Sequence, residues 1–209
     1  MPSYVDAIEK VLKHEGGYVF DKNDRGGRTN MGITQAVYEQ FLGRKLSEAE
    51  AEQVMKNMPK GNAIQIYKSQ YWDKIKGDQI KTYIVAFLIF DAAVNSGVTQ
   101  AIKTAQRVLG INPDGVAGPE YLKHLNNFDP QTFVDEYIKA RKSFYQAIVD
   151  KNPTQQKFLK GWLTRASLNE AYAKVVKFVG TTAGKATVGI GGLLLLTGVF
   201  FLLRSLRKK

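Results

Sequence analysis

Apolar residues recur at helical spacing over most of this chain. Residues 4–15 place their apolar side chains three or four positions apart, and Gly16 and Gly17 follow as a stop signal. Residues 83–95 are apolar on nearly every face, which is typical of a helix in the middle of a fold. Further amphipathic segments continue to about residue 164. The pattern therefore predicts a mainly α-helical protein.

Helical spacing is lost between Tyr18 and Thr34. This stretch contains the turn-forming pairs Asn23-Asp24 and Gly26-Gly27. We expect a small, irregular β-hairpin here, near the N-terminus of an otherwise helical globule.

A long apolar run lies near the C-terminus. Residues 186–203 contain no charged side chain and are followed by a basic tail, 204–209. As a helix this run would be about 27 Å long, close to the thickness of the hydrocarbon core of a bilayer. The run predicts a single transmembrane helix that binds the lipid bilayer, in a bacterial inner membrane or a virion membrane. Its orientation stays open, because basic residues flank both ends.

Composition removes several classes of function. The chain has 209 residues, no cysteine and a formal net charge of +11. A disulfide scaffold, a thiol enzyme and an iron–sulfur site are therefore excluded. His14 and His124 are too isolated for a metal site, so we expect no metal and no cofactor. Because the basic excess gathers around the apolar run, we expect no binding to nucleic acid.

Glu15 is the best candidate for a catalytic acid. It ends the inward face of helix 4–15, where partial desolvation and the negative end of the helix dipole both disfavour the ionised carboxylate. A general acid needs such an environment. Gly16 and Gly17 leave room for a substrate beside it. The alternative is a structural Glu that pairs with a nearby cation.

Cleavage of a glycosidic bond also requires a second group, which activates water or stabilises positive charge. Asp21 and Asp24 are the next acids along the chain, and either could serve. Thr29 and Asn30 could position a water molecule. Alternatively, the two aspartates are turn residues that bind loop amides.

Several motifs occur in an order that resembles glycoside hydrolase family 108, the N-acetylmuramidases of phages and prophages. They cover about residues 4–165 and are His14-Glu-Gly-Gly-Tyr18, Asp21-Lys-Asn-Asp-Arg-Gly-Gly-Arg-Thr-Asn30, Met31-Gly-Ile-Thr34, Tyr71-Trp-Asp-Lys-Ile-Lys-Gly-Asp78, Phe90-Asp-Ala-Ala-Val-Asn-Ser-Gly97, Ala105-Gln106, Asp114-Gly-Val-Ala-Gly-Pro119 and Phe158-Leu-Lys-Gly-Trp-Leu-Thr-Arg165. The resemblance implies a lysozyme-like fold in which Glu15 is the catalytic acid.

The loop departs from the usual family pattern. Lys22, Arg25 and Arg28 stand where the family has two prolines and an alanine. These cations suit an anionic wall polymer. The spacing also resembles that of phage lysozymes, in which eight residues separate the catalytic Glu from a second acidic residue. This spacing favours Asp24 over Asp21. Their threonine would fall at position 30, so Thr29 is a looser assignment. The residues expected to contact substrate are Gly16, Gly17, Tyr18, Lys22, Arg25, Arg28 and Asn95.

Two other segments allow two interpretations each. Residues 114–119 resemble the turn-plus-helix motif of peptidoglycan-binding modules, or form a tight turn whose Pro119 opens the next helix. Asp91 and Asn95 should share one helix face, where they line the cleft floor or fasten the Glu15 loop by hydrogen bonds.

The sequence thus predicts a membrane-anchored hydrolase for phage lysis or wall penetration. It would cleave the β-1,4 bond between N-acetylmuramic acid and N-acetylglucosamine in peptidoglycan. The alternatives are a lytic transglycosylase and a non-catalytic wall-binding membrane protein with a lysozyme fold. The expected divisions are a muramidase domain over 1–165 (catalytic part 4–90, peptidoglycan-binding-like part 91–165), a basic linker over 166–185, the span 186–203 and the tail 204–209.

Overall fold

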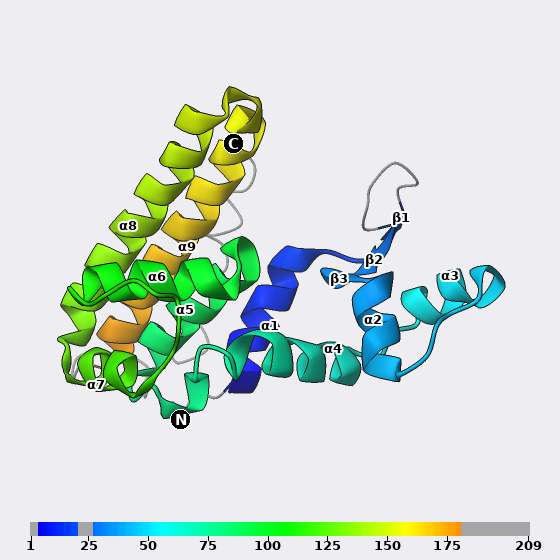
Figure 1. The fold of residues 1–209 in the computed structure, drawn as a ribbon, viewed down its shortest axis with the longest axis horizontal. Coiled ribbons are helices and arrows are strands. Elements are labelled where there is room, and N and C mark those ends of the chain that lie inside the picture. Colours follow the sequence, from blue (N-terminus) through cyan, green and yellow to red (C-terminus); the bar gives the residue numbers. More distant parts are fainter. Residues whose placement is uncertain (1–3, 21–26, 181–209) are drawn as a thin grey trace. The chain divides into compact units, whose positions relative to one another are not determined.

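The structure is a computed structural model that describes residues 4–20 and 27–180 (Figure 1). Its elements are α1 (Tyr4–Glu15), β1 (Val19–Phe20), β2 (Arg28–Asn30), β3 (Ile33–Thr34), α2 (Gln35–Leu42), α3 (Glu48–Lys56), α4 (Lys60–Tyr67), the π-helix η1 (Lys68–Trp72), the 3₁₀-helix η2 (Gly77–Gln79), α5 (Tyr83–Ser96), α6 (Val98–Val108), α7 (Pro119–Asn127), α8 (Pro130–Lys151), the 3₁₀-helix η3 (Pro153–Gln155) and α9 (Gln156–Gly180). The prediction of a mainly helical fold with one small β element is confirmed.

The chain forms two compact units. The first contains the described residues up to Lys103 together with Asp114–Asn126. The second contains Thr104–Pro113 and the described residues from Asn127 onward. Each unit is described by itself below.

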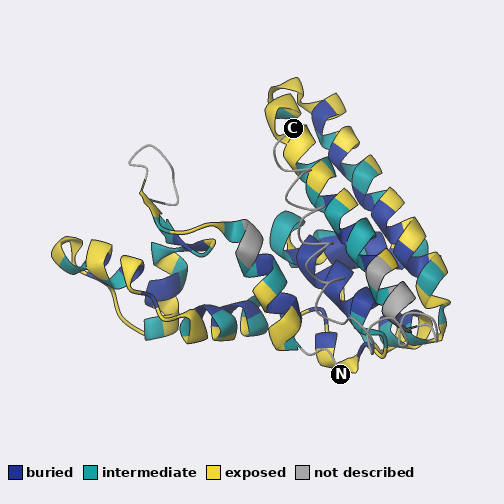
Figure 2. Cartoon of the chain, turned by 180° about the vertical axis from the view of Figure 1, so that it is seen from behind, coloured by how far each residue is buried: buried dark blue, intermediate teal, exposed yellow. Residues whose placement is uncertain are grey.

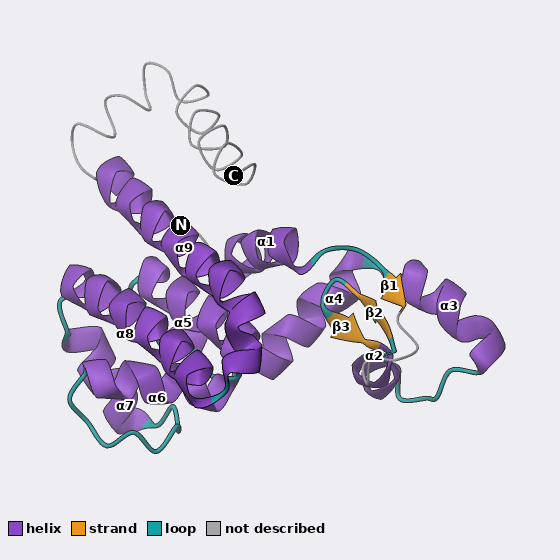
Figure 3. Ribbon diagram, turned by 90° about the horizontal axis from the view of Figure 1, so that it is seen from above, coloured by secondary structure: helices purple, strands orange, loops and turns teal. Residues whose placement is uncertain are grey.

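The β element of the first unit is a three-stranded antiparallel sheet in the order β1-β2-β3 (Figure 3). Thr29 pairs with Val19 on one side and with Thr34 on the other. Between β2 and β3, Met31 and Gly32 form a two-residue loop with φ of 49° and 73°. Positive φ at both loop positions is the signature of the type I′ turn, whose twist matches that of paired strands. The sheet therefore has one strand more than the predicted hairpin.

The core of the first unit is built around α5. Ten consecutive residues of this helix, Ile84 to Ala93, are buried, which explains why the segment is apolar on every side. Trp72, at the end of η1, packs edge-on against Phe90 with ring centroids 5.5 Å apart. Figure 2 shows the contrast with α3, which is mostly exposed. The expected position of 83–95 in the middle of the fold is confirmed.

The second unit is a pair of long helices, α8 and α9, which lie side by side (Figures 1 and 3). The buried side chains between them are Tyr145, Val149, Leu159 and Ala166. α9 continues through Arg165 to Gly180 without a break. Residues 166–180, which we expected to begin a basic linker, therefore continue α9, and Ala166, Asn169 and Ala173 among them are buried.

Within the described residues, no helix combines the length and the apolar character needed to cross a bilayer. This finding contradicts the predicted location as a single-pass membrane protein, and we withdraw that prediction. Residues 186–203, on which it rested, lie outside the described residues. A count of uncharged positions measures apolar character alone.

Candidate active site

Glu15 is the last residue of α1, so its carboxylate stands at the negative end of the helix dipole, as expected. The helix is anchored by Ala7, Ile8 and Val11, which are fully buried. Gly16 ends it with a φ of +75°, a conformation that favours glycine. Among the described residues, nothing lies within 4 Å of a Cβ built on either Gly16 or Gly17. Within the described part of the chain, the space beside these two glycines is therefore free.

Gly32, in the turn between β2 and β3, closes the other side of Glu15. A Cβ on Gly32 would stand 2.8 Å from Oε2 and 3.2 Å from Cβ of Glu15. It would also stand 2.5 Å from the hydroxyl of Tyr67. The helix end and the hairpin turn therefore approach closely, and a side chain at position 32 would strain the backbone and force the Glu15 and Tyr67 side chains to shift.

Tyr67, the last residue of α4, fixes this turn. Its hydroxyl donates a hydrogen bond to the carbonyl oxygen of Met31 over 2.9 Å. Met31 has a left-handed backbone, which costs a non-glycine residue about 1–2 kcal/mol. The bond from Tyr67 offsets part of that cost and holds the turn against Glu15.

Tyr71 adds a second phenol to the site. Its ring stacks on that of Tyr67 with centroids 5.4 Å apart. It belongs to the π-helix η1, a rare geometry that is frequent at functional sites. Burial, and then the negative charge of Glu15, raise the pKa of the Tyr71 hydroxyl. The hydroxyl therefore stays protonated at neutral pH, within the electrostatic reach of Glu15.

Sequence reasoning missed Gly32, Tyr67 and Tyr71 as site residues. The Met31-Gly32 pair carries a weak turn signal, because glycine accepts a positive φ. No local sequence pattern predicts the π-helix that contains Tyr71. These residues come from separate elements, and only the fold brings them to Glu15.

Arg28 does not have the expected role of a loop cation that meets substrate. Its guanidinium pairs with both carboxylate oxygens of Glu48, the longer contact being 3.3 Å. It also lies 4.4 Å from the centroid of the Phe20 ring. The residue is 8% exposed, and its hydrogen bond to the Glu48 carboxylate is the main cause that raises its pKa. Arg28 is a structural residue that ties β2 to α3.

Asn30 is equally committed to α3. Its side-chain amide donates to the carbonyl oxygens of Met55 over 2.7 Å and Lys56 over 3.3 Å. These carbonyls belong to the last turn of α3, whose own amide partners end there. A buried amide that caps a helix in this way is not placed to hold a water for catalysis.

The structure places the remaining candidates as follows. Thr29 lies half-buried in the central strand and, by the alternation of a strand, faces away from Arg28 and Asn30. Tyr18 is half-buried, and the Lys56 ammonium lies 5.2 Å from its ring centroid. Asn95 is half-buried on α5, whereas Asp91 is fully buried, which favours the fastening role for Asp91. Lys22, Arg25, Asp21 and Asp24 lie outside the described residues.

Residues 114–119 contain a turn at Asp114 that leads into α7, which fits both interpretations of this segment. The Asp114 carboxylate accepts a hydrogen bond from the amide of Val116 over 2.8 Å, and Pro119 is the first residue of α7. The described residues contain no group of three or more His, Asp or Glu side chains that could hold a metal ion.

Comparison with known proteins gives two family matches. Residues 8–97 match the family described as glycosyl hydrolase 108, and residues 100–167 match the family described as a predicted peptidoglycan domain. The solved structure of SagA from Brucella abortus is similar, with 34% identity and a TM-score of 0.68. The match covers 86% of this chain and 97% of that one. Among curated proteins, no match was found.

Proposed function

This chain belongs to the glycosyl hydrolase 108 family and is a glycoside hydrolase that acts on peptidoglycan, and from that premise we propose that it cleaves the β-1,4 bond between N-acetylmuramic acid and N-acetylglucosamine. The catalytic acid in this proposal is Glu15. The lysozyme-like fold implied by the resemblance belongs to the same proposal.

One observation carries the assignment of Glu15. Its side chain lies close to Gly32 in the turn, while no described atom lies within 4 Å of a Cβ built on Gly16 or Gly17, the two residues that follow it. A carboxylate held firmly on one side and open on the other can meet a leaving oxygen at a fixed distance, as general acid catalysis requires. A Glu that serves only a surface ion pair needs neither feature.

Tyr67 and Tyr71 have supporting roles in this proposal. Tyr67 positions the Met31-Gly32 turn through its bond to Met31, and so positions Glu15. The Tyr71 hydroxyl, kept protonated, is a donor for a substrate hydroxyl or acetamide oxygen near the acid. Both act through rings that stack on each other, so their orientations depend on one another.

The second catalytic group is proposed from the sequence. We favour Asp24 over Asp21 for activating water or stabilising the positive charge at the anomeric carbon. Thr29, in the central strand, is the candidate for positioning that water. Whether the carboxylate acts on water or on the sugar itself sets the stereochemical outcome, because the two mechanisms require different separations of the carboxyl groups.

The experiment is digestion of purified peptidoglycan, with mass spectrometry of the released muropeptides and a reducing-end assay. We expect new reducing ends at N-acetylmuramic acid. Reducing N-acetylglucosamine ends would place the cut at the other bond and overturn the proposal. Products lighter by one water, with anhydro ends, would identify a lytic transglycosylase, in which Glu15 acts as acid and then as base.

A further inference from the structure

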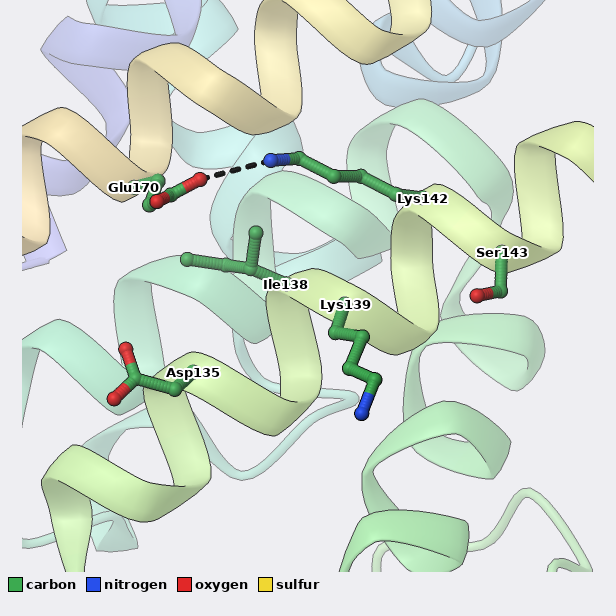
Figure 4. Close-up of a pocket in the computed structure, with 6 residues that line it drawn as sticks. All are labelled: Asp135, Ile138, Lys139, Lys142, Ser143 and Glu170. Carbon is green, nitrogen blue, oxygen red and sulfur yellow. Dashed lines mark hydrogen bonds and ion pairs between the residues drawn. The ribbon is translucent and has the colours of Figure 1, made fainter.

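The second unit contains a hollow between α8 and α9 (Figure 4), with a volume of about 360 Å³. This is within the size range of small-ligand sites. The residues that line it are Asp135, Ile138, Lys139, Lys142, Ser143 and Glu170. Five of the six stand on α8 at helical spacing and form one stripe, and Glu170 faces them from α9.

The hollow carries both signs of charge around an apolar floor. Ile138 is 3% exposed and forms the floor. Two carboxylates, Asp135 and Glu170, and two ammonium groups, Lys139 and Lys142, surround it. The formal charges cancel. Neither a simple anion nor a simple cation is therefore favoured by the site as a whole.

Two of these charged groups, Lys142 and Glu170, already form ion pairs within the protein. Lys142 donates to Glu170 over 2.8 Å, and Lys174 donates to the other oxygen of Glu170 over 3.0 Å. The hydrogen bond from Lys142, followed by that from Lys174, lowers the pKa of Glu170, so this carboxylate stays ionised. Lys142 keeps two further N–H donors for a ligand.

The other two charges face the solvent. Asp135 accepts hydrogen bonds from the neutral amide of Gln131 over 3.0 and 3.1 Å, and no cation within the described ranges pairs with it. The Lys139 side chain is 75% exposed, and its ammonium lies 3.8 Å from Glu136. Figure 4 shows the side chains of Asp135 and Lys139 pointing away from each other. A carboxylate and an ammonium thus stand one helical turn apart with space between them.

From this arrangement we propose that the hollow binds the zwitterionic end of a diamino acid in the stem peptide of peptidoglycan. The ligand ammonium would bind Asp135, its carboxylate would bind Lys139, and its methylene groups would lie on Ile138. This inference rests on the proposed function, which identifies peptidoglycan as the polymer that the protein binds. Five of the six lining residues also lie within 100–167, the stretch that matches the predicted peptidoglycan domain.

The charges favour the peptide over the glycan strand. Sugar hydroxyls and acetamides are neutral, so they would bring no counter-charge to the exposed carboxylate of Asp135 or to the largely exposed ammonium of Lys139. The end of a diamino acid carries an ammonium and a carboxylate on one carbon atom, and it satisfies both kinds of group at once. The proposed site would therefore bind the peptide, whereas Glu15 would act on the sugar.

Binding of three synthetic stem peptides to the full chain tests this inference. The first carries the zwitterionic side-chain end, the second carries an amide in place of that carboxylate, and the third carries lysine, which has the ammonium alone. We expect titration calorimetry to show the first peptide binding about two- to fivefold more tightly than either other, as exposed charge pairs allow. Equal affinities for all three would overturn the proposal.

Matched variants identify the residues. Asp135→Asn and Lys139→Gln should each remove the preference for the zwitterionic peptide. Asp150→Asn and Lys151→Gln are the controls, because both residues are exposed on α8 outside the hollow. Asp150 also accepts a bond from a glutamine one turn earlier, Gln146, over 2.8 Å, which reproduces the setting of Asp135. A loss of preference in the control variants as well would show a nonspecific charge effect and contradict the site.

Cleavage of glycan strands stripped of their peptides separates this inference from the proposed function. If the chain cleaves the stripped strands but does not distinguish the peptides, only the peptide site is wrong. If it distinguishes the peptides but yields no muramic acid reducing ends from any wall, the proposed bond is wrong and the peptide site stands.

Discussion

Oε2 of Glu15 lies 2.8 Å from the point where a Cβ atom on Gly32 would stand. The contact joins the end of the first helix to the turn of a hairpin that begins after a further loop. It makes the hairpin part of the proposed catalytic site. The backbone at position 32 therefore lies close to the proposed acid.

The first prediction follows from that contact. Gly32→Ala should lower the free energy of unfolding by about 2–4 kcal/mol, from the left-handed backbone and the overlap with Glu15 and Tyr67. It should also reduce kcat in the fraction that remains folded. Thermal unfolding and wall digestion measure the two effects.

Gly43→Ala is the control for this variant. Gly43 has a φ of +68°, but no described atom lies within 4 Å of a Cβ built on it. Gly43→Ala therefore has the same cost of a left-handed backbone as Gly32→Ala, but it has no steric overlap with described side chains. If both variants lose the same stability and neither loses activity, the turn does not position the acid.

The second prediction concerns the acid itself. Glu15→Gln should reduce peptidoglycan cleavage by a factor of about 10² to 10⁴, because the amide cannot give up a proton to the leaving oxygen. Its melting temperature should match that of the wild type. Glu9→Gln, the same change in an exposed residue of the same helix that pairs with Lys60 over 2.7 Å, should keep full activity. A Gln variant at position 15 that clears wall suspensions at the wild-type rate would remove Glu15 from the mechanism.

A third prediction concerns the cap on α3. Asn30→Ala should cost about 1–3 kcal/mol, because it removes the buried side-chain donor to the carbonyl oxygens of Met55 and Lys56. Asn30→Asp should be worse at pH 7, since a carboxylate would then face the two carbonyl oxygens. At acidic pH the protonated carboxyl can donate, so the gap between Asn30→Asp and Asn30→Ala should narrow. A gap that stays constant between pH 7 and pH 3 would argue against the cap.

The fourth prediction is a pH dependence centred on Glu39. Hydrogen bonds from Lys45 and Gln35, with a further bond from the amide of Leu46, lower the pKa of this carboxyl to about 2. A carboxyl whose pKa is depressed in the folded state contributes stability above its unfolded pKa, near 4.3, and loses it as the pH falls toward 2. The difference in melting temperature between the wild type and Glu39→Gln should therefore shrink between pH 5 and pH 2.

Glu52→Gln is the comparison for Glu39. Glu52 also has its pKa lowered, chiefly by a hydrogen bond from Lys56, but both partners of this pair are about half exposed. Solvent screens such pairs, so its pH dependence should be weaker. The reverse order of the two effects would be inconsistent with this account of Glu39.

Local pattern determined much of the architecture. Helical spacing marked α1, and the absence of any polar face marked α5 as a central helix. Glycines and turn residues marked the β region. The order of the motifs indicated the family, and the position of Glu15 at the end of a helix made it the proposed acid. These features are local, because spacing, capping and turn chemistry act over a few residues.

The tertiary structure showed which candidate side chains already have partners within the protein. Arg28 and Thr29 are adjacent in sequence, yet Arg28 is buried against Glu48 whereas Thr29 faces the other side of the strand. Tyr67 and Gly32 are far apart in sequence and meet only when α4 packs against the hairpin. The sequence shows that a residue is charged, but it shows neither the partner of that charge nor the burial of the side chain. Both are set by contacts between elements, which local pattern does not contain.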